Sequence, residues 1–216
     1  MQMMSNKDIY EKKAVIFDVD GTLYNQSHMR IYMFIRLVSF YSLHLKSIKE
    51  LIAIYYFRKL REEEKYRASG IEKITEIVAE RLHIKTDIVA SAIKKWMFEI
   101  PLDVINKCSY SDVISCARKF RDAEKKIIIY SDYPAEEKLS ALEIPYDYIF
   151  VSGEGYLQEL KPSIHAMKHI LHSTELSPNE IIYIGDRDEK DGTSAKLVGI
   201  QYCDIHHFRR LISKHV

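Results

Sequence analysis

Two carboxylates stand close together near the start of the chain, in the stretch AVIFDVDGTL at residues 14–23. Asp18 and Asp20 follow four apolar residues and precede Gly21, so they lie at the mouth of a predicted buried strand. Such a pair suits an all-oxygen site for a hard cation such as Mg²⁺, which removes their repulsion. A carboxylate beside the cation can attack a phosphorus atom. A second carboxyl can protonate the leaving oxygen and later deprotonate a water molecule.

Polar residues also follow two later apolar runs. IIIY at residues 127–130 leads to Ser131 and Asp132, and IIYI at residues 181–184 leads to Asp186. Open α/β sheets bind ligands at the carboxyl ends of their strands, so we expect Asp186 to join Asp18 and Asp20 around the metal. Ser131 can donate a hydrogen bond to a transferring phosphoryl group. Lys161, which Pro162 holds extended before a helix, can offset the negative charge of that group.

Alternating runs predict the elements that bring these side chains together. Short β-branched or aromatic runs indicate strands, and apolar residues at helical spacing indicate helices. We expect strands near residues 13–18, 126–130, 148–151, 181–184 and 200–202, and helices near 111–120, 135–142, 163–172 and 193–198. This alternation is typical of βαβ crossovers, so the sequence predicts an α/β fold with a Rossmann-like, doubly wound parallel sheet.

A long segment between the first two strands is predicted to be helical. Residues 27–98 contain no Pro and one Gly, and we expect three or four helices with breaks near Ser47, Ser69–Gly70 and Lys85–Thr86. One expected apolar face holds Leu51, Ile54, Tyr55 and Arg58, and another holds Ile71, Ile74, Ile77, Val78 and Leu82. We therefore expect an α-helical cap domain at residues 25–100, inserted after the first strand of a core domain that comprises residues 1–24 and 101–216.

The most apolar part of this cap is Ile31–Leu45, which contains Arg36 and falls short of the roughly 20 apolar residues of a membrane span. We expect a buried amphipathic helix and no stable membrane insertion, with a helix at the membrane interface as the alternative. Residues 28–67 hold nine Lys or Arg against four Glu. This surplus can attract an anionic substrate, although a solvated outer face explains it slightly better.

Composition excludes several classes of protein. The 32 Lys and Arg balance 31 Asp and Glu, so no overall basic field indicates binding to nucleic acid. The three cysteines form neither a CxxC pair nor an even framework, which is typical of reduced thiols. Residues 1–13 are polar and lack the apolar centre of a signal peptide. We expect a cytoplasmic protein, and the sequence leaves the oligomeric state open.

Four motifs, in order, resemble those of the haloacid dehalogenase-like (HAD) hydrolase superfamily. They are DVDGTLY at residues 18–24, the strand end at Ser131, the Lys161–Pro162 step and GDRDEKD at residues 185–191. The helical segment directly after the first motif resembles the family's helical C1-type cap. The resemblance implies a Mg²⁺-dependent phosphatase that hydrolyses a small phosphate monoester through an aspartyl-phosphate intermediate.

The same resemblance implies roles for individual residues. Asp18 is the expected nucleophile and Asp20 the expected general acid and base. Ser131 and Lys161 are the expected phosphate binders. The expected Mg²⁺ ligands are the carboxylates of Asp18 and Asp186 and the backbone carbonyl of Asp20, while Asp191 is expected to support Lys161 or the metal.

Extra acidic residues depart from the family pattern. Asp132 follows Ser131 where a neutral residue is common, and a role as a helix cap explains it as well as a role in function. Asp188 and Glu189 add negative charge inside the last motif, and we expect both to be solvated.

Other activities share much of this pattern. A phosphomutase or another phosphotransferase of the family keeps the same core residues and differs in its cap. A dehalogenase does not need Asp20, and a phosphonate hydrolase needs a Schiff-base lysine, for which no cap lysine stands out. From a different class, a receiver-like phospho-acceptor signalling module also combines a doubly wound sheet with acidic residues, but it has no long helical insert.

Overall fold

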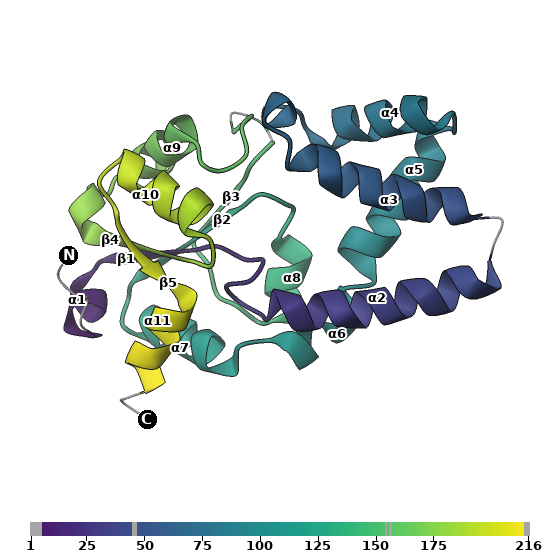
Figure 1. Ribbon diagram of the computed structural model, residues 1–216. Helices are drawn as coiled ribbons and strands as arrows, with labels where there is room; N and C mark the ends of the chain where they lie inside the picture. Colours follow the sequence, from purple (N-terminus) through teal and green to yellow (C-terminus); the bar gives the residue numbers. More distant parts are fainter. Residues whose placement is uncertain (1–5, 45–46, 154, 156, 214–216) are drawn as a thin grey trace.

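A parallel sheet forms the centre of the computed structural model, which describes residues 6–44, 47–153, 155 and 157–213 (Figure 1). The strands are β1 (Ala14–Phe17), β2 (Lys126–Ser131), β3 (Tyr148–Val151), β4 (Ile181–Gly185) and β5 (Gln201–Asp204). Their order is β3-β2-β1-β4-β5, with every neighbouring pair parallel. The first strand is therefore central, and the sheet extends from it in both directions. This is the doubly wound α/β topology that the sequence predicts.

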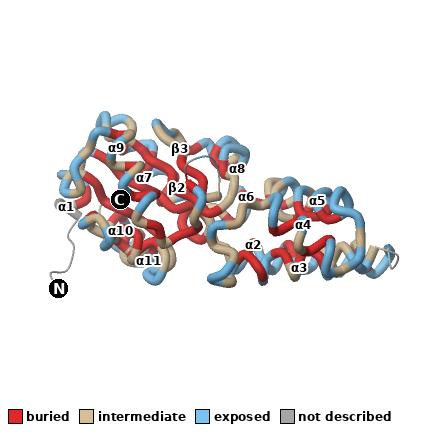
Figure 2. The backbone as a smooth tube through the Cα atoms, turned by 90° about the horizontal axis from the view of Figure 1, so that it is seen from above, coloured by how far each residue is buried: buried red, intermediate tan, exposed pale blue. Residues whose placement is uncertain are grey.

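Both faces of the sheet are covered by helices, which explains why β1 consists entirely of buried apolar residues. Val15 and Phe17 belong to the larger apolar cluster, with side chains of α1, α7, α8 and α11. Ala14 and Ile16 belong to the cluster on the other face, with side chains of α9 and α10. The helices are α1 (Asn6–Glu11), α7 (Ser111–Asp122), α8 (Glu136–Ala141), α9 (Ile164–Thr174), α10 (Thr193–Leu197) and α11 (Ile205–Ile212). Figure 2 shows the buried backbone running through β2 and β3.

The segment between β1 and β2 is helical and extends to one side of the sheet (Figure 1). Its elements are α2 (Gln26–Leu43), α3 (Ile48–Arg61), η2 (Glu64–Tyr66), α4 (Ile71–Leu82), α5 (Thr86–Ile93), the π-helix η3 (Lys94–Glu99) and α6 (Leu102–Cys108). The expected breaks near Ser47, Ser69–Gly70 and Lys85–Thr86 are confirmed. Helices α3, α4 and α5 share an apolar cluster of their own, separate from the two clusters of the sheet.

Two short helical turns flank β4. They are η4 (Pro178–Glu180), which precedes β4, and the π-helix η5 (Asp188–Gly192), which follows it. The turn η5 carries the end of the GDRDEKD motif and leads directly into α10. It therefore holds the last acidic residue of that motif, Asp191, beside the carboxyl end of β4.

The predicted apolar face of α3 is correct at Ile54, which is buried, and at Leu51, which is half-buried, but it is wrong at Tyr55 and Arg58. Tyr55 is 61% exposed and Arg58 is also exposed, whereas Ala53, Phe57 and Leu60 are buried against α4 and α5. Apolar residues occur all round α3, so periodicity alone does not determine which face packs. On α4 the predicted face is correct at its centre, where Ile74 and Val78 are buried.

The interpretation of Ile31–Leu45 as a buried helix is correct for one side of α2. Met33 and Tyr41 are buried, whereas Ile31 and Phe34 are 58% and 67% exposed. Leu45 lies outside the described residues. Among the helices described, none combines the length and the hydropathy that crossing a membrane requires.

Candidate active site

The carboxyl ends of β1, β2 and β4 bring the predicted residues to one edge of the sheet. Phe17 pairs with Ile129 of β2 and with Ile184 of β4, so the residues that follow these strands lie side by side. The backbone N–H of Asp18 still donates to the carbonyl of Ile184, at 3.0 Å. The sheet therefore fixes the backbone of Asp18 and directs its carboxylate to the strand ends.

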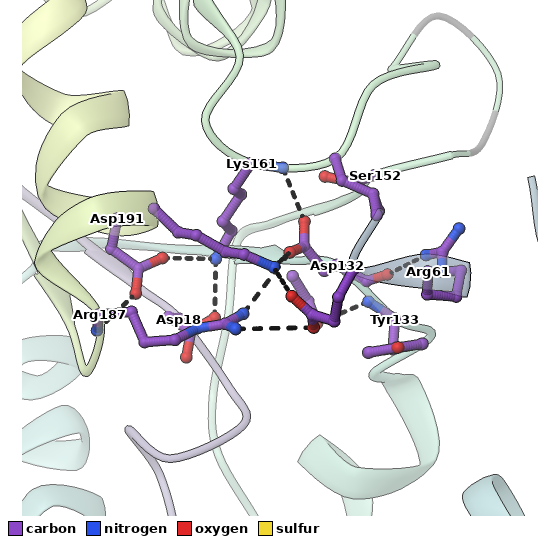
Figure 3. A network of polar contacts seen from close by, with 12 residues as sticks. Asp18, Arg61, Asp132, Tyr133, Ser152, Lys161, Arg187 and Asp191 are labelled. Carbon is purple, nitrogen blue, oxygen red and sulfur yellow. Dashed lines mark hydrogen bonds and ion pairs between the residues drawn. The ribbon is translucent and has the colours of Figure 1, made fainter. Parts of the chain in front are cut away.

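Lys161 joins two of these carboxylates (Figure 3). Its Nζ lies 2.7 Å from Oδ1 of Asp18 and 2.9 Å from Oδ1 of Asp191. The lysine is 2% exposed, and its Nζ lies 4.7 Å from the centre of the Tyr130 ring. Burial lowers the pKa of Lys161, but Asp18 and Asp191 raise it further, to well above its ordinary value. Lys161 is therefore a fixed positive charge inside the site.

Asp191 acts as the partner of Lys161. Its Oδ1 also accepts a hydrogen bond from the Tyr183 hydroxyl at 2.9 Å, and its Oδ2 accepts one from the backbone N–H of Arg187 at 3.2 Å. Despite burial, Lys161 and these donors lower the pKa of Asp191. Both oxygens already have donors, so of the two expected roles the contacts favour support of Lys161 over metal ligation.

Three carboxylates lie close together at the strand ends, and the positive charge beside them does not balance their negative charge. Oxygen atoms of Asp18, Asp186 and Asp191 lie within 4.8 Å of one another. Burial raises the pKa of Asp18 to about 7 although Lys161 opposes the shift, and Asp191 and Asp186 add to the increase. Burial and Asp191 likewise raise the pKa of Asp186 to about 6. With all three ionised beside one ammonium group, the cluster has two net negative charges, which a divalent cation would balance.

The side chain of Asp186 supports this fit with a metal. Its Oδ1 is buried and has no hydrogen-bond partner among the described residues. A buried carboxylate oxygen without a partner is costly, and a cation would satisfy it. The donors of this cluster are all oxygen, which suits Mg²⁺.

Two glycines allow the close approach of these carboxylates. Gly21 has φ +104, and a Cβ placed there would lie 2.1 Å from Oδ2 of Asp186. A Cβ at Gly185 would lie 2.5 Å from Cβ of Asp191. The glycines of both acidic motifs are therefore required by the geometry of the site.

Asp20 has a different environment from Asp18. The Nζ of Lys138 on α8 donates to its Oδ1 at 2.5 Å, and the hydroxyl of Tyr24 donates to the same oxygen. Burial raises the pKa of Asp20, but Lys138 and Tyr24 lower it to below its ordinary value. The Asp20 carboxylate is therefore ionised and lies outside the group of three carboxylates that could hold a metal.

The last residue of β2, Ser131, and the residue that follows it, Asp132, hold the opposite side of the site. Ser131 is 1% exposed, and its Oγ accepts a hydrogen bond from the backbone N–H of Tyr133 at 3.2 Å, which leaves its hydroxyl hydrogen to donate elsewhere. Asp132 is also buried, and its Oδ1 accepts a hydrogen bond from the backbone N–H of Lys161 at 3.0 Å. Asp132 thus fixes the backbone of the lysine that holds Asp18.

The helical segment reaches the site through the end of α3 (Figure 3). Arg61 is 1% exposed, and its guanidinium donates to the carbonyl of Asp132 at 2.8 Å. The next residue, Glu62, pairs with Lys190 at 2.9 Å. Asp188 and Glu189 are exposed, as expected, and Asp188 pairs with Lys196 at 3.2 Å.

Sequence reasoning missed four of these contacts. Lys138 and Arg61 are common residue types at positions that no motif marks, and Tyr24 lies in the first motif, but the sequence does not show what these side chains contact. Asp132 was noticed as a departure from the family pattern, and the structure identifies what it contacts. Only a weak sequence feature points to Lys138, which is a lysine on the helix that follows the strand end at Ser131.

Comparisons with known proteins agree with this arrangement. The family model of the haloacid dehalogenase-like hydrolases matches residues 12–199. The chain belongs to the haloacid dehalogenase-like hydrolases. The match includes every predicted site residue and the helical segment between β1 and β2. No curated protein matches the chain in sequence.

Solved structures of this family share the fold at low sequence identity. A 2-haloacid dehalogenase from Pseudomonas syringae pv. Tomato DC3000 is 15% identical, with a TM-score of 0.64 over 88% of this chain and 85% of that chain. YfnB from Bacillus subtilis, solved bound to magnesium, is 14% identical, with a TM-score of 0.61 over 89% and 88%. A HAD phosphatase from Thermococcus onnurineus is 17% identical, with a TM-score of 0.50 over 88% and 84%. At these identities the similarity shows the fold and leaves the substrate open.

Proposed function

We propose that this HAD-like hydrolase is a phosphatase that hydrolyses a small phosphate monoester through an aspartyl-phosphate on Asp18. The observation that carries the proposal is the second aspartate of the first motif. Asp20 is half-buried beside the site and bound by Lys138 and Tyr24, so it provides a positioned acid and base in addition to the nucleophile. Phosphoryl transfer from an ester uses such a group, whereas displacement of a halide does not.

The proposed reaction uses residues of this chain in two steps. In the first, a carboxylate oxygen of Asp18 bonds to phosphorus, the ester P–O bond breaks, and Asp20, which enters this step in its protonated form, donates its proton to the leaving oxygen. In the second, Asp20 removes a proton from a water molecule, whose oxygen bonds to phosphorus and displaces the carboxylate of Asp18. The products are an alcohol and inorganic phosphate. Lys161 holds Asp18 in place, and the hydroxyl of Ser131 donates to the phosphoryl oxygens.

The residues present fit a Mg²⁺ cofactor. We propose that Asp18 and Asp186 hold it with their carboxylates, and Asp20 with its backbone carbonyl. When bound, Mg²⁺ supplies positive charge that favours the approach of an anionic phosphoryl group to an anionic nucleophile.

We also propose that residues 25–100 act as a C1-type cap over a core formed by residues 1–24 and 101–216. The contacts of Arg61 and Glu62 with residues after β2 and β4 support this division, because they join the helical segment to the strand ends that carry the site. A cap that closes over the site would exclude water from the aspartyl-phosphate. We place the reaction in the cytoplasm, because all three cysteines are free and buried.

A screen of small phosphate esters, with and without Mg²⁺, tests the proposal. The wild-type protein should release phosphate in Mg²⁺, and both excess chelator and Asp18→Asn should abolish the release. Full activity in chelator would contradict the metal requirement. Halide release from 2-haloacids, without phosphate release, would show a dehalogenase instead. Conversion of a sugar phosphate into its isomer without release of phosphate would show a phosphomutase.

A further inference from the structure

Exposed apolar side chains gather on two helices of the segment between β1 and β2. On α2, the residues Ile31, Phe34, Ile35 and Val38 are all more than half exposed, with exposures of 58%, 67%, 56% and 52%. Their spacing of three, four and seven residues places them on one face of the helix. This face lies opposite the buried side chains of Met29 and Met33. Helix α2 is therefore apolar on the side that packs and on the side that meets solvent.

Helix α3 has a similar exposed stripe. Ile48, Ile52 and Tyr55 are exposed at a spacing of four and seven residues, opposite the buried Phe57 and Leu60. Together the two helices hold most of the large apolar side chains that are exposed in the described part of the chain. Exposed apolar surface that is concentrated on two consecutive helices is typical of an interaction site.

The charges beside these stripes are positive. Arg30 and Lys49 are neighbours of Ile31 and Ile48 in the chain, and Arg58 and Lys59 lie one helical turn after Tyr55. All four basic side chains are exposed, and none forms an ion pair with another of the residues that the structure describes.

The four acidic residues within residues 28–67 each have a polar partner. Glu50 accepts a hydrogen bond from Tyr41 at 3.2 Å, and Glu62 pairs with Lys190 at 2.9 Å. Glu63 and Glu64 pair with Lys65 and Arg67, at 3.4 Å and 3.0 Å. The charge left for a partner on this surface is therefore positive, and the partner that complements it is anionic.

We propose that α2 and α3 bind the surface of an anionic lipid membrane, with the apolar stripes entering the interface and the four basic residues meeting lipid phosphates. Amphipathic helices with aromatic residues and flanking Lys or Arg bind membranes in this way, without spanning them. Tyr32, Phe34 and Tyr55 supply the aromatic rings, which favour the membrane interface. A second copy of the chain is a poorer partner, because a symmetric dimer through this surface would bring its unpaired basic residues together.

Flotation with lipid vesicles tests this proposal on the whole chain. The wild-type protein should float with vesicles made of equal parts phosphatidylglycerol and phosphatidylcholine. It should remain at the bottom of the gradient with phosphatidylcholine alone. High salt should weaken the binding, since each Lys or Arg near an anionic surface contributes roughly a factor of five.

Two double variants and their matched controls separate the two contributions. Phe34→Asp/Val38→Asp should weaken binding by at least about tenfold for each side chain removed, because both apolar groups leave the interface. Arg58→Glu/Lys59→Glu should weaken it by at least roughly 25-fold. The matched controls are Leu197→Asp, which also places Asp at an exposed apolar position, and Lys119→Glu/Lys168→Glu, which reverses two exposed charges elsewhere. The controls should bind as the wild type does.

Other outcomes would overturn the proposal. If the wild-type protein does not float with anionic vesicles, the surface does not bind lipid. If Phe34→Asp/Val38→Asp converts a stable dimer to a monomer in light scattering, the partner is a second copy. Circular dichroism confirms that each variant is folded. Hydrolysis of a dissolved phosphate ester is measured separately, so a failure of the proposed phosphatase activity does not affect this result.

Discussion

Asp18 and Asp20 leave the same strand two residues apart, yet each has its own lysine. Lys161 binds Asp18 in the group of three carboxylates, while Lys138 and Tyr24 bind Asp20 outside it. Burial raises the pKa of Asp18 to about 7, whereas Lys138 lowers the pKa of Asp20 against the effect of burial. The two carboxyls therefore differ in protonation behaviour, and a cation beside Asp18 would keep the proposed nucleophile ionised.

Asp20→Asn tests this division of roles. The variant keeps the nucleophile but has no proton donor, and general acid–base assistance is typically worth about 10²–10⁴-fold. We expect a loss of that size on alkyl phosphates and a smaller loss on p-nitrophenyl phosphate, whose leaving group needs little protonation. Steady-state rates on both substrates measure the difference.

Phosphoenzyme trapping provides the control for Asp20→Asn. Phosphorylated protein should accumulate in Asp20→Asn and should be absent in Asp18→Asn. Equal losses on both classes of ester without a trapped intermediate would contradict the role given to Asp20. Labelling of Asp18→Asn at the active site would contradict the role given to Asp18.

Lys138→Met should change the pH dependence of the first step. Without the lysine, only Tyr24 and Lys161 oppose the effect of burial, so the pKa of Asp20 rises. Protonation of the leaving group requires protonated Asp20, and a higher pKa keeps that form present at higher pH. The alkaline limb of kcat/KM should therefore shift to higher pH, as pH-rate profiles would show. Lys119→Met, on the exposed face of α7, should leave the profile unchanged.

Individual site residues differ in how far the sequence predicts them. Asp18, Asp186 and Ser131 follow apolar runs that read clearly as strands, so their meeting at one edge follows from the topology. Lys138 and Asp132 act through contacts with residues distant in the chain, at sequence separations of 118 and 29. The position of such side chains depends on the packing of whole elements, which local sequence patterns do not describe.

At the scale of elements, the end of α3 connects the helical segment to the strand ends. Arg61 donates to the carbonyl of Asp132, and Glu62 pairs with Lys190 of η5. The chain after α3 also contacts the loop before α9, where the N–H of Leu160 donates to the carbonyl of Arg67 at 3.0 Å. A cap that opens and closes must break and re-form contacts at this boundary.

Glu62→Gln tests whether the ion pair across this boundary restrains the cap. The side chain of Glu62 is 57% exposed, so loss of the pair should change stability by less than about 1 kcal/mol. We expect faster amide hydrogen exchange in residues 62–70, because the boundary opens more often. Mass spectrometry of exchanged peptides measures this effect.

Glu64→Gln is the matched control. Glu64 pairs with Arg67 within the same segment, at 3.0 Å, and this ion pair does not cross to the strand ends. Exchange should therefore remain close to that of the wild type. Equal exchange in both variants would mean that the pair of Glu62 with Lys190 does not restrain the boundary.

The sequence predicts helices and strands best where the pattern of apolar residues fits only one arrangement. The strands of the sheet are buried on both faces, and their short apolar runs lie close to the observed bounds. The predicted face of α3 was wrong at Tyr55 and Arg58, because apolar residues occur on several sides of that helix. Helix α11 was not predicted, although Asp204 caps it by accepting hydrogen bonds from the N–H groups of His206 and His207. A cap residue directly after a strand was a usable signal there.

At the scale of the whole molecule, net charge and local charge differ. The chain is nearly neutral, with 32 Lys and Arg against 31 Asp and Glu. The described structure separates these charges into an acidic cluster at the strand ends and a basic surface on α2 and α3. The balance of the whole chain therefore says little about what either region binds, and recognition depends on where the fold concentrates each sign.

The acidic cluster links the stability of the molecule to pH and to Mg²⁺. The pKa values of Asp18 and Asp186 rise from 3.8 to about 7 and about 6, so the folded protein holds these protons more tightly than the unfolded chain does. Their contribution to stability is fully present below about pH 4 and is lost as pH rises through about 6 to 7. Asp20 and Asp191 have lowered pKa values. Their contribution to stability is present above about pH 4 and is lost as pH falls below that value.

Mg²⁺ should therefore stabilise the protein more at about pH 8 than at about pH 5. At the higher pH the cluster is ionised and the cation offsets its repulsion, whereas at the lower pH protons compete for the same oxygens. At about 100 times its Kd, Mg²⁺ should contribute about 2.7 kcal/mol. For a chain of 216 residues this corresponds to a rise in Tm of roughly 5–10 °C. Differential scanning fluorimetry with and without Mg²⁺ at both pH values measures the difference.

Asp186→Asn gives this experiment its control. The amide keeps the shape of the side chain but removes one of the charges that the cation balances, so the variant should lose most of the response to Mg²⁺. Its metal-free form should become less dependent on pH, because one of the two carboxyls with a raised pKa is gone. An equal rise in Tm at both pH values, or an undiminished response in Asp186→Asn, would place the cation elsewhere on the molecule.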